Sequence, residues 1–186
     1  MMILVTGGAA SGKSEYAERL LLELGQGWKK TYLATMQRDG KEAEARIARH
    51  KDLRAGKGFE TVECPVLVGG AVGACQPAVL LECVSNLVAN EMFGATVKRH
   101  VADAIVREIL TLSEQAELLV VVTNEVFSDG LPYKGDTLDY IRELGSVNRQ
   151  LAASADAVAE VVYGIPVWHK GAIDKVEQTE GSQQRK

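Results

Sequence analysis

The sequence contains little cysteine and carries no excess of positive charge. Its three cysteines, Cys64, Cys75 and Cys83, form no Cys-x-x-Cys pair and have no neighbouring histidine at metal-ligand spacing. An odd number of cysteines in a chain of this size indicates reduced thiols rather than a disulfide framework. The formal net charge of −4 argues against broad, non-specific binding to nucleic acid, so nucleic acid is not an expected partner.

The sequence also lacks long apolar runs. No stretch approaches the roughly 20 apolar residues that a membrane-spanning helix requires. The N-terminal apolar run is short, ends in glycine, and has no positively charged segment before it, unlike a secretory signal peptide. We therefore expect a cytoplasmic protein without a membrane span. Its 46% hydrophobic and 25% charged residues are typical of a globular protein, and a chain of 186 residues is long enough for one domain.

Short β-prone runs alternate with helix-like segments along the chain. The predicted strands are 3–6, 31–35, 59–63, 78–83, 118–123 and 156–163. The predicted helices are 14–24, 40–54, a long region from 84 to 114 that is broken near Gly94, and 137–154. This alternation predicts a mostly parallel sheet with helices on both faces. We therefore predict an α/β protein with a single P-loop (RecA-like) domain over residues 1–176 and a polar tail over 177–186. Residues 69–77 fit no element, and 127–135 are expected to form a loop.

A phosphate-binding loop lies between the first predicted strand and the first predicted helix. Residues 7–14 match the pattern G-x-x-x-x-G-K-[ST] in its expected context. Such a loop places backbone N–H groups and a helix N-terminus around phosphate oxygens. We expect Lys13 to reach the β- and γ-phosphates and Ser14 to ligate Mg²⁺. The nucleotide-binding residues predicted from the loop are Gly7, Gly8, Ala9, Ala10, Ser11, Gly12, Lys13 and Ser14. The pattern predicts a bound nucleoside triphosphate without specifying the reaction.

Two acids could orient the metal ion. Glu82 and Glu125 each lie at or just beyond the end of a predicted buried strand. From position alone, each could either orient Mg²⁺ or simply face solvent at the end of its strand. We favour Glu82. The chain has neither an Asn-Lys-x-Asp motif of a GTPase nor a Leu-Ser-Gly-Gly-Gln-like motif of a transporter ATPase. A small-molecule kinase or transferase therefore remains the favoured class.

A basic segment follows the second predicted strand. Arg46, His50 and Arg54 are spaced four residues apart and share one face of the predicted helix. Spacing alone favours a solvated helix surface. The alternative is that the cations hold a polyphosphate and that His50 acts on it, since nearby cations favour the neutral imidazole that a nucleophile requires.

A series of segments in order along the chain matches a known family. These segments are 1–9 with 11–14, 32–35, 46–54, 61–63, 80–83, 122–126, 148–152, 155–156 and 161–166. They resemble the bifunctional adenosylcobinamide kinase / adenosylcobinamide-phosphate guanylyltransferase family of cobalamin synthesis. The resemblance implies that the enzyme phosphorylates the aminopropanol hydroxyl of adenosylcobinamide with a nucleoside triphosphate. It then implies transfer of GMP from GTP through a guanylylated His50, which gives adenosylcobinamide-GDP and pyrophosphate.

The same resemblance implies the remaining site residues and the assembly. The resemblance implies His50 as a catalytic residue. The loop pattern adds Lys13 as a catalytic residue and Ser14 as a ligand of Mg²⁺, and Glu82 is the acid that we favour as a second ligand. Further nucleotide contacts are implied at Ala34, Thr35, Met36, Lys51, Asp52, Leu53, Arg54, Glu63 and Glu82. The substrates would be adenosylcobinamide and GTP or ATP, and the assembly would be a homotrimer. The chain departs from the family between Phe127 and Pro132. Two other functions remain open, namely a kinase-only P-loop enzyme that acts on a corrinoid or another small alcohol, and a GTP-binding regulatory protein.

Overall fold

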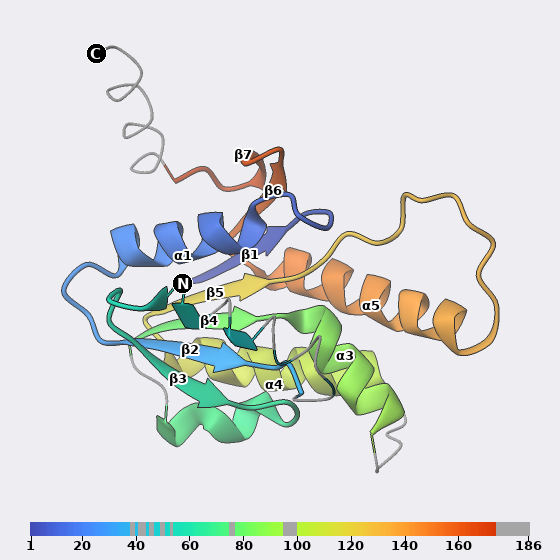
Figure 1. Ribbon diagram of the computed structural model, residues 1–186, viewed down its shortest axis with the longest axis horizontal. Coiled ribbons are helices and arrows are strands. Elements are labelled where there is room, and N and C mark those ends of the chain that lie inside the picture. Colours follow the sequence, from blue (N-terminus) through green and yellow to red (C-terminus); the bar gives the residue numbers. More distant parts are fainter. Residues whose placement is uncertain are drawn as a thin grey trace.

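A seven-stranded sheet runs through the described part of the chain (Figure 1). The computed structural model describes residues 1–37, 40, 44, 47–48, 51–52, 54–74, 77–94 and 100–173. The strands are β1 Met2–Thr6, β2 Lys30–Ala34, β3 Phe59–Glu63, β4 Ala78–Glu82, β5 Leu118–Val122, β6 Ala157–Val162 and β7 Ile165–Lys170. Their order in the sheet is β3-β2-β4-β5-β1-β6-β7. Strands β1 to β6 pair in parallel, and β7 runs antiparallel to β6 at one edge.

The central strands β1, β4 and β5 are almost entirely apolar, because both of their faces are covered. In β1, Ile3 and Val5 pack into one hydrophobic cluster, whereas Met2 and Leu4 pack into the cluster on the opposite face. Successive side chains of a strand point to opposite faces, so a strand in a sandwiched parallel sheet needs an unbroken apolar run. Strand β5 meets the same requirement, and all of its residues are buried.

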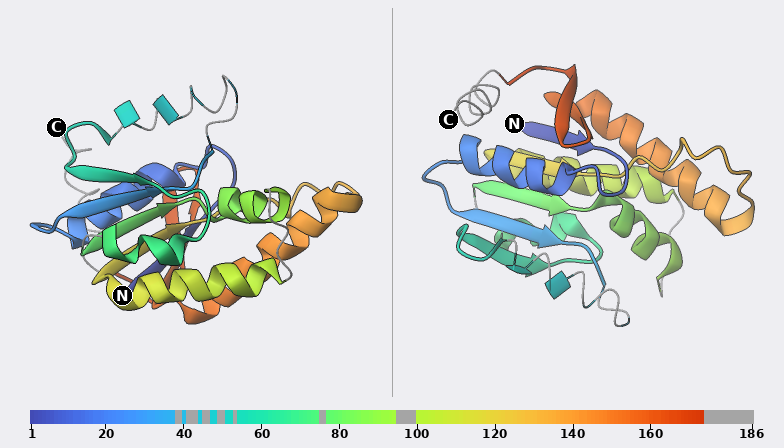
Figure 2. Two further views of the ribbon diagram at one scale, coloured as in Figure 1. Left: turned by 90° about the horizontal axis from the view of Figure 1, so that it is seen from below. Right: turned by 45° about the horizontal axis from the view of Figure 1, so that its top comes forward.

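Helices cover both faces of the sheet, as predicted (Figure 2). The helices are α1 Lys13–Leu24, α3 Val84–Phe93, α4 Val101–Gln115 and α5 Gly135–Ser154. Helix α1 packs on one face through side chains such as Leu20 and Leu21, and α3, α4 and α5 share the cluster on the other face. None of the helices in the described ranges is long and apolar enough to cross a membrane.

The predicted strands and the helices outside 40–54 are confirmed, and the structure adds two more elements. The six predicted strands are present to within one residue at each end, and the long helical region is divided into α3 and α4 around Gly94. In the range 40–54, the described residues are helical up to Arg54. The unassigned range 69–77 contains a 3₁₀ helix, η1 Val68–Ala74. The strand predicted at 156–163 ends before Gly164, as expected, but the prediction that it is the last strand is wrong, because β7 follows it directly.

Strand β7 could be missed because an edge strand has weak sequence requirements. Its residues are mostly exposed, so they do not show the apolar run of the central strands. Pro166 is tolerated there because an edge strand has one side without a ladder partner. The predicted tail, 177–186, lies outside the described residues, and the domain limits remain a prediction.

Candidate nucleotide and catalytic site

The phosphate-binding loop connects β1 to α1 through a tight turn that requires glycine. Gly12 precedes α1 in the left-handed region, with φ of 89°. A Cβ atom added at Gly7, whose φ is 156°, would lie 2.6 Å from Ser11 Oγ and 2.7 Å from the carbonyl oxygen of Val161. Larger residues at these two positions would therefore displace the loop. The loop lies at the carboxyl end of β1, where ligands bind in open α/β sheets.

The turn between β6 and β7 supports this loop from the side. The backbone N–H of Gly164 donates a hydrogen bond to the carbonyl oxygen of Ser11 at 2.8 Å. A Cβ atom at Gly12 would come within 3.2 Å of the Gly164 Cα atom. The antiparallel strand that sequence patterns missed is therefore connected to a turn that contacts the phosphate-binding loop.

Lys13 folds back over the loop. Its Nζ atom donates a hydrogen bond to the carbonyl oxygen of Gly8 at 3.0 Å. Partial burial lowers the pKa of Lys13, because desolvation disfavours the charged amine, and the nearby Cys83 and Glu82 oppose this shift. Phosphate oxygens that enter the loop would place negative charge beside Lys13 and so stabilise its protonated form.

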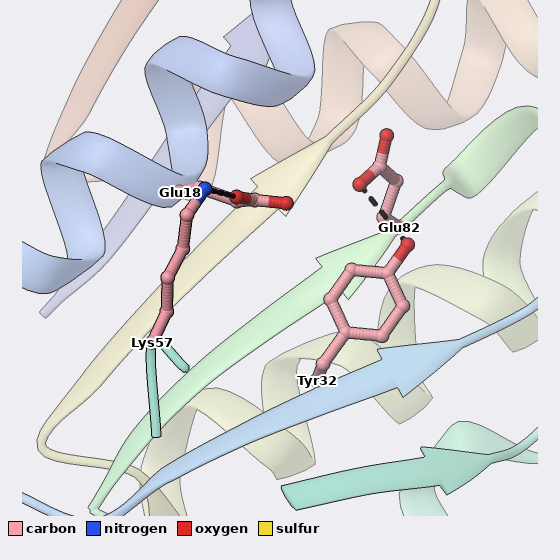
Figure 3. A network of polar contacts seen from close by, with 4 residues as sticks. All are labelled: Glu18, Tyr32, Lys57 and Glu82. Atoms are coloured by element: carbon pink, nitrogen blue, oxygen red, sulfur yellow. Dashed lines mark hydrogen bonds and ion pairs between the residues drawn. The ribbon is translucent and has the colours of Figure 1, made fainter. Parts of the chain in front are cut away.

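Ser14 and Glu82 meet at the carboxyl end of the sheet. Ser14 Oγ donates a hydrogen bond to Glu82 Oε1. The other carboxylate oxygen, Oε2, accepts a hydrogen bond from Tyr32 Oη at 3.1 Å, as Figure 3 shows. A serine hydroxyl and a carboxylate are oxygen ligands of the type that Mg²⁺ prefers. The described residues contain no cluster of three or more metal-ligating side chains. This pair therefore fits an ion that takes its other ligands from water and phosphate.

Glu125 is held in a different arrangement. Its Oε1 atom accepts hydrogen bonds from the backbone N–H of Phe127 at 2.8 Å and from Ser128 Oγ at 3.0 Å. These contacts stabilise the loop that follows β5. The geometry thus brings Glu82, and not Glu125, into contact with the P-loop serine.

Arg54 lies against the same group of residues. Its guanidinium carbon is 3.3 Å from the centroid of the Tyr32 ring, and the residue is only 6% exposed. The Arg54 Nε and Nη1 atoms are buried without a hydrogen-bond partner within the described part of the chain. The expectation of a solvated face is therefore wrong for Arg54. Arg46 and His50, which belong to the same predicted face, lie outside the described residues.

One cavity of about 970 Å³ joins the phosphate-binding loop to the basic segment. The predicted site residues that line it are Ala9, Ala10, Ser11, Gly12, Lys13, Ser14, Ala34, Met36, Lys51, Arg54, Glu63 and Glu82. Gly7, Gly8, Thr35 and Asp52 are not among the lining residues. Thr35 is fully buried, and its Oγ1 atom accepts a hydrogen bond from the backbone N–H of Cys83 at 2.7 Å. His50 and Leu53 lie outside the described residues, so their predicted roles remain predictions.

Sequence reasoning missed several lining residues. Tyr32 contacts both Glu82 and Arg54, and Glu18 forms an ion pair across the cavity with Lys57, at 2.6 Å (Figure 3). Glu18 follows Ser14 by one helical turn, so the helical spacing could have indicated that both face the cavity. The other cavity-lining residues that were not predicted are Glu15, Ile47, Thr61, Cys83, Asn86, Asn124 and Val126, and Glu125, the alternative candidate for the metal, also lines the cavity.

The sheet order, the loop after β1 and the Ser14–Glu82 contact define a P-loop protein of the RecA-like fold class. Flagellar accessory protein FlaH from Methanocaldococcus jannaschii shares this fold, with a TM-score of 0.51 and 16% identity over 91% of this chain and 77% of that chain. A sequence model described as cobinamide kinase / cobinamide phosphate guanyltransferase matches residues 3–168, and the chain belongs to this family.

Two relatives are similar to almost the whole chain. The bifunctional adenosylcobalamin biosynthesis protein CobU of Salmonella typhimurium is 38% identical over 90% of this chain and 98% of its own length. The protein of the same name from Escherichia coli strain K12 is 36% identical, with the same coverage of both chains.

Proposed function

We propose that this chain is a bifunctional enzyme that phosphorylates adenosylcobinamide and then transfers GMP from GTP onto the product. The observation that supports this proposal is the single cavity that contains both the phosphate-binding loop and the cations Lys51 and Arg54. These cations follow His50 closely in the sequence. A triphosphate held by the loop therefore lies in the same cavity as the segment proposed to carry the second reaction.

In the kinase reaction, the loop holds the triphosphate through its backbone N–H groups and Lys13. The substrate hydroxyl oxygen forms a bond to the γ-phosphorus and loses its proton to solvent, while the bond from the γ-phosphorus to the bridging oxygen breaks and the nucleoside diphosphate leaves. Ser14 and Glu82 are the residues that would hold Mg²⁺, which neutralises phosphate charge when bound. Glu82 is buried, so few water molecules compete for its carboxylate. The hydrogen bond from Ser14 directs that carboxylate toward the loop.

In the transferase reaction, a ring nitrogen of His50 forms a bond to the α-phosphorus of GTP, and pyrophosphate leaves. A phosphate oxygen of adenosylcobinamide phosphate then displaces the histidine and yields adenosylcobinamide-GDP. Lys51, together with the Arg54 Nε and Nη1 donors that have no hydrogen-bond partner among the described residues, is suited to stabilise the negative charge that develops on the phosphate oxygens. Two displacements also mean that GTP and the corrinoid phosphate need not occupy the site together.

The proposed assembly is a homotrimer, which follows from the family resemblance. Exposed apolar side chains at Val162, Tyr163, Ile165 and Val167 give the β6–β7 edge a surface suited to contact with another copy of the chain. Analytical ultracentrifugation tests this assembly, because a trimer and a monomer differ threefold in mass. A monomer at micromolar concentration would contradict it.

Incubation with GTP labelled at the α-phosphate, followed by denaturation, tests the proposed function. We expect protein-bound label that is labile in acid and stable in base, and that is absent in His50→Ala. Phosphorylation of adenosylcobinamide without any protein-bound label would instead indicate a kinase-only enzyme. Nucleotide binding without either reaction would indicate a regulatory protein.

A further inference from the structure

Tyr32 lines the cavity and has two separate contacts. Its hydroxyl donates to Glu82 Oε2 at 3.1 Å, and its ring lies 3.3 Å below the Arg54 guanidinium carbon. The residue is 4% exposed. One side chain therefore connects the acid beside the phosphate-binding loop to the cation that follows His50 in the sequence.

The register of the sheet explains why Tyr32 reaches Glu82. In the parallel pair β2–β4, Ala34 is level with Glu82, and Tyr32 is level with Leu80. Tyr32 and Ala34 are two residues apart and therefore share one face of the strand. The long tyrosine side chain crosses diagonally from its own position to the carboxylate at the end of the neighbouring strand.

The Tyr32 hydroxyl is a buried donor to Glu82. The residue is almost fully removed from solvent, so water competes little for the hydrogen bond between the phenol and the carboxylate. Glu82 Oε1 receives the Ser14 hydroxyl, while Oε2 receives the phenol. Two donors at opposite oxygens fix the rotation of the carboxylate.

The Tyr32 ring has a different effect, on Arg54. A guanidinium group over an aromatic face is held by cation–π attraction, and this contact does not use its N–H donors. The Nε and Nη1 atoms are buried and have no partner within the described ranges. The contact therefore fixes the position of the cation and leaves donors available for an anion.

We propose that Tyr32 is a positioning residue for both reactions, with its hydroxyl orienting Glu82 for phosphoryl transfer and its ring placing Arg54 for guanylyl transfer. This inference rests on the proposed function. It assigns two separable effects to one side chain, because the hydroxyl can be removed without the ring.

Tyr32→Phe removes the hydroxyl and keeps the ring. We expect the Mg²⁺ concentration for half-maximal kinase activity to rise about tenfold, the size expected for losing one hydrogen bond to a charged group. Calorimetry should show the same shift in the Mg²⁺ dependence of nucleotide binding, which is a readout independent of turnover. At saturating Mg²⁺, where the altered Mg²⁺ dependence no longer limits nucleotide binding, the rate at which α-labelled GTP labels the protein should remain within about twofold of the unmodified chain.

Tyr32→Leu removes both the hydroxyl and the ring. We expect it to repeat the Mg²⁺ effect and, in addition, to slow labelling by α-labelled GTP by tenfold or more. Tyr140→Phe is the matched control, because it deletes another partly buried tyrosine hydroxyl, which donates to the Ser85 carbonyl oxygen at 3.2 Å. The control should leave both readouts unchanged. Circular dichroism of each variant shows whether it is folded.

Two results would overturn the inference. One is a Tyr32→Phe protein with an unchanged Mg²⁺ dependence of binding. The other is a loss of both reactions to the same extent in Tyr32→Phe and Tyr32→Leu, which indicates a purely structural role. If the unmodified chain takes no label, the proposed transferase reaction fails, whereas the calorimetric result for Tyr32→Phe still decides the role of the hydroxyl.

Discussion

Lys57 Nζ lies 2.6 Å from Glu18 Oε2 and links the turn after Arg54 to helix α1 across the cavity (Figure 3). The Glu18 side chain is 5% exposed and that of Lys57 is 36% exposed. A carboxylate buried to this extent depends on its cation, because solvent does little to stabilise its charge. The contact therefore connects two walls of the site. It also makes the stability of the protein sensitive to replacement of Lys57.

Lys57→Ala should destabilise the protein by about 1–3 kcal/mol, because it leaves the Glu18 charge buried without its partner. The double variant Glu18→Gln, Lys57→Ala should recover part of this loss. The measurement is the free energy of unfolding from urea denaturation. Arg142→Ala is the control, because Arg142 pairs with Asp139 at 3.5 Å on the exposed surface and should contribute less than ~0.5 kcal/mol. Equal losses in the two single variants would contradict the prediction.

The two glycines that open the phosphate-binding loop should respond differently to substitution. Gly7→Ala places a Cβ atom 2.7 Å from the Val161 carbonyl oxygen, at a φ of 156°. Gly8→Ala meets no atom within 4 Å. We expect Gly7→Ala to lower the free energy of unfolding by roughly 1–3 kcal/mol and Gly8→Ala to change it by less than about 0.5 kcal/mol. Chemical denaturation of both variants checks this, and a similar loss in both would show that the close approach is unimportant.

Local patterns predicted the elements of this fold well and its long-range contacts poorly. The phosphate-binding loop could be predicted because strand, glycines and helix follow one another within a few residues. The Tyr32–Glu82 contact joins residues 50 positions apart. It depends on the register between β2 and β4, which no local pattern specifies. The Lys57–Glu18 pair, 39 positions apart, could not be predicted for the same reason.

The choice between Glu82 and Glu125 shows the same limit. Both acids follow buried strands, so position alone left the choice open. The structure separates them because the chain after Glu125 turns back and donates to its carboxylate, whereas Glu82 faces Ser14. Arg54 illustrates a further limit, since a charged helix usually faces solvent and burial against Tyr32 could not be read from spacing.

Glu82→Gln should impair the kinase reaction far more than Glu125→Gln. The amide keeps the shape of the Glu82 side chain but removes the charge that would help to hold Mg²⁺ beside Ser14. We expect kcat for phosphorylation to fall by about 100-fold, which corresponds to ~2.7 kcal/mol of activation free energy. Glu125→Gln should stay within about threefold, because Glu125 stabilises its own loop. Steady-state kinetics at saturating Mg²⁺ compare the two variants, and the reverse order of effects would assign the metal to Glu125.

The affinity for nucleoside triphosphate should fall in alkaline solution through loss of the Lys13 charge. Burial lowers the pKa of Lys13, so the free protein loses this proton at a lower pH than an exposed lysine would. Only the protonated amine attracts phosphate, and bound phosphate in turn favours protonation. Binding should therefore weaken as pH rises through the lowered pKa, and it should take up protons in that range.

Other groups near Lys13 do not produce the same dependence. Burial raises the pKa of the Cys83 thiol and that of the Tyr32 phenol, so both shifts run opposite to the lowered pKa of Lys13. Calorimetric titrations in buffers of different ionisation enthalpy measure both the affinity and the proton uptake. Lys13→Ala is the control, because it removes the amine and retains the titration of the nucleotide itself. Its binding should be weaker at neutral pH and should vary less with pH, and identical pH profiles for the two proteins would contradict the role of Lys13.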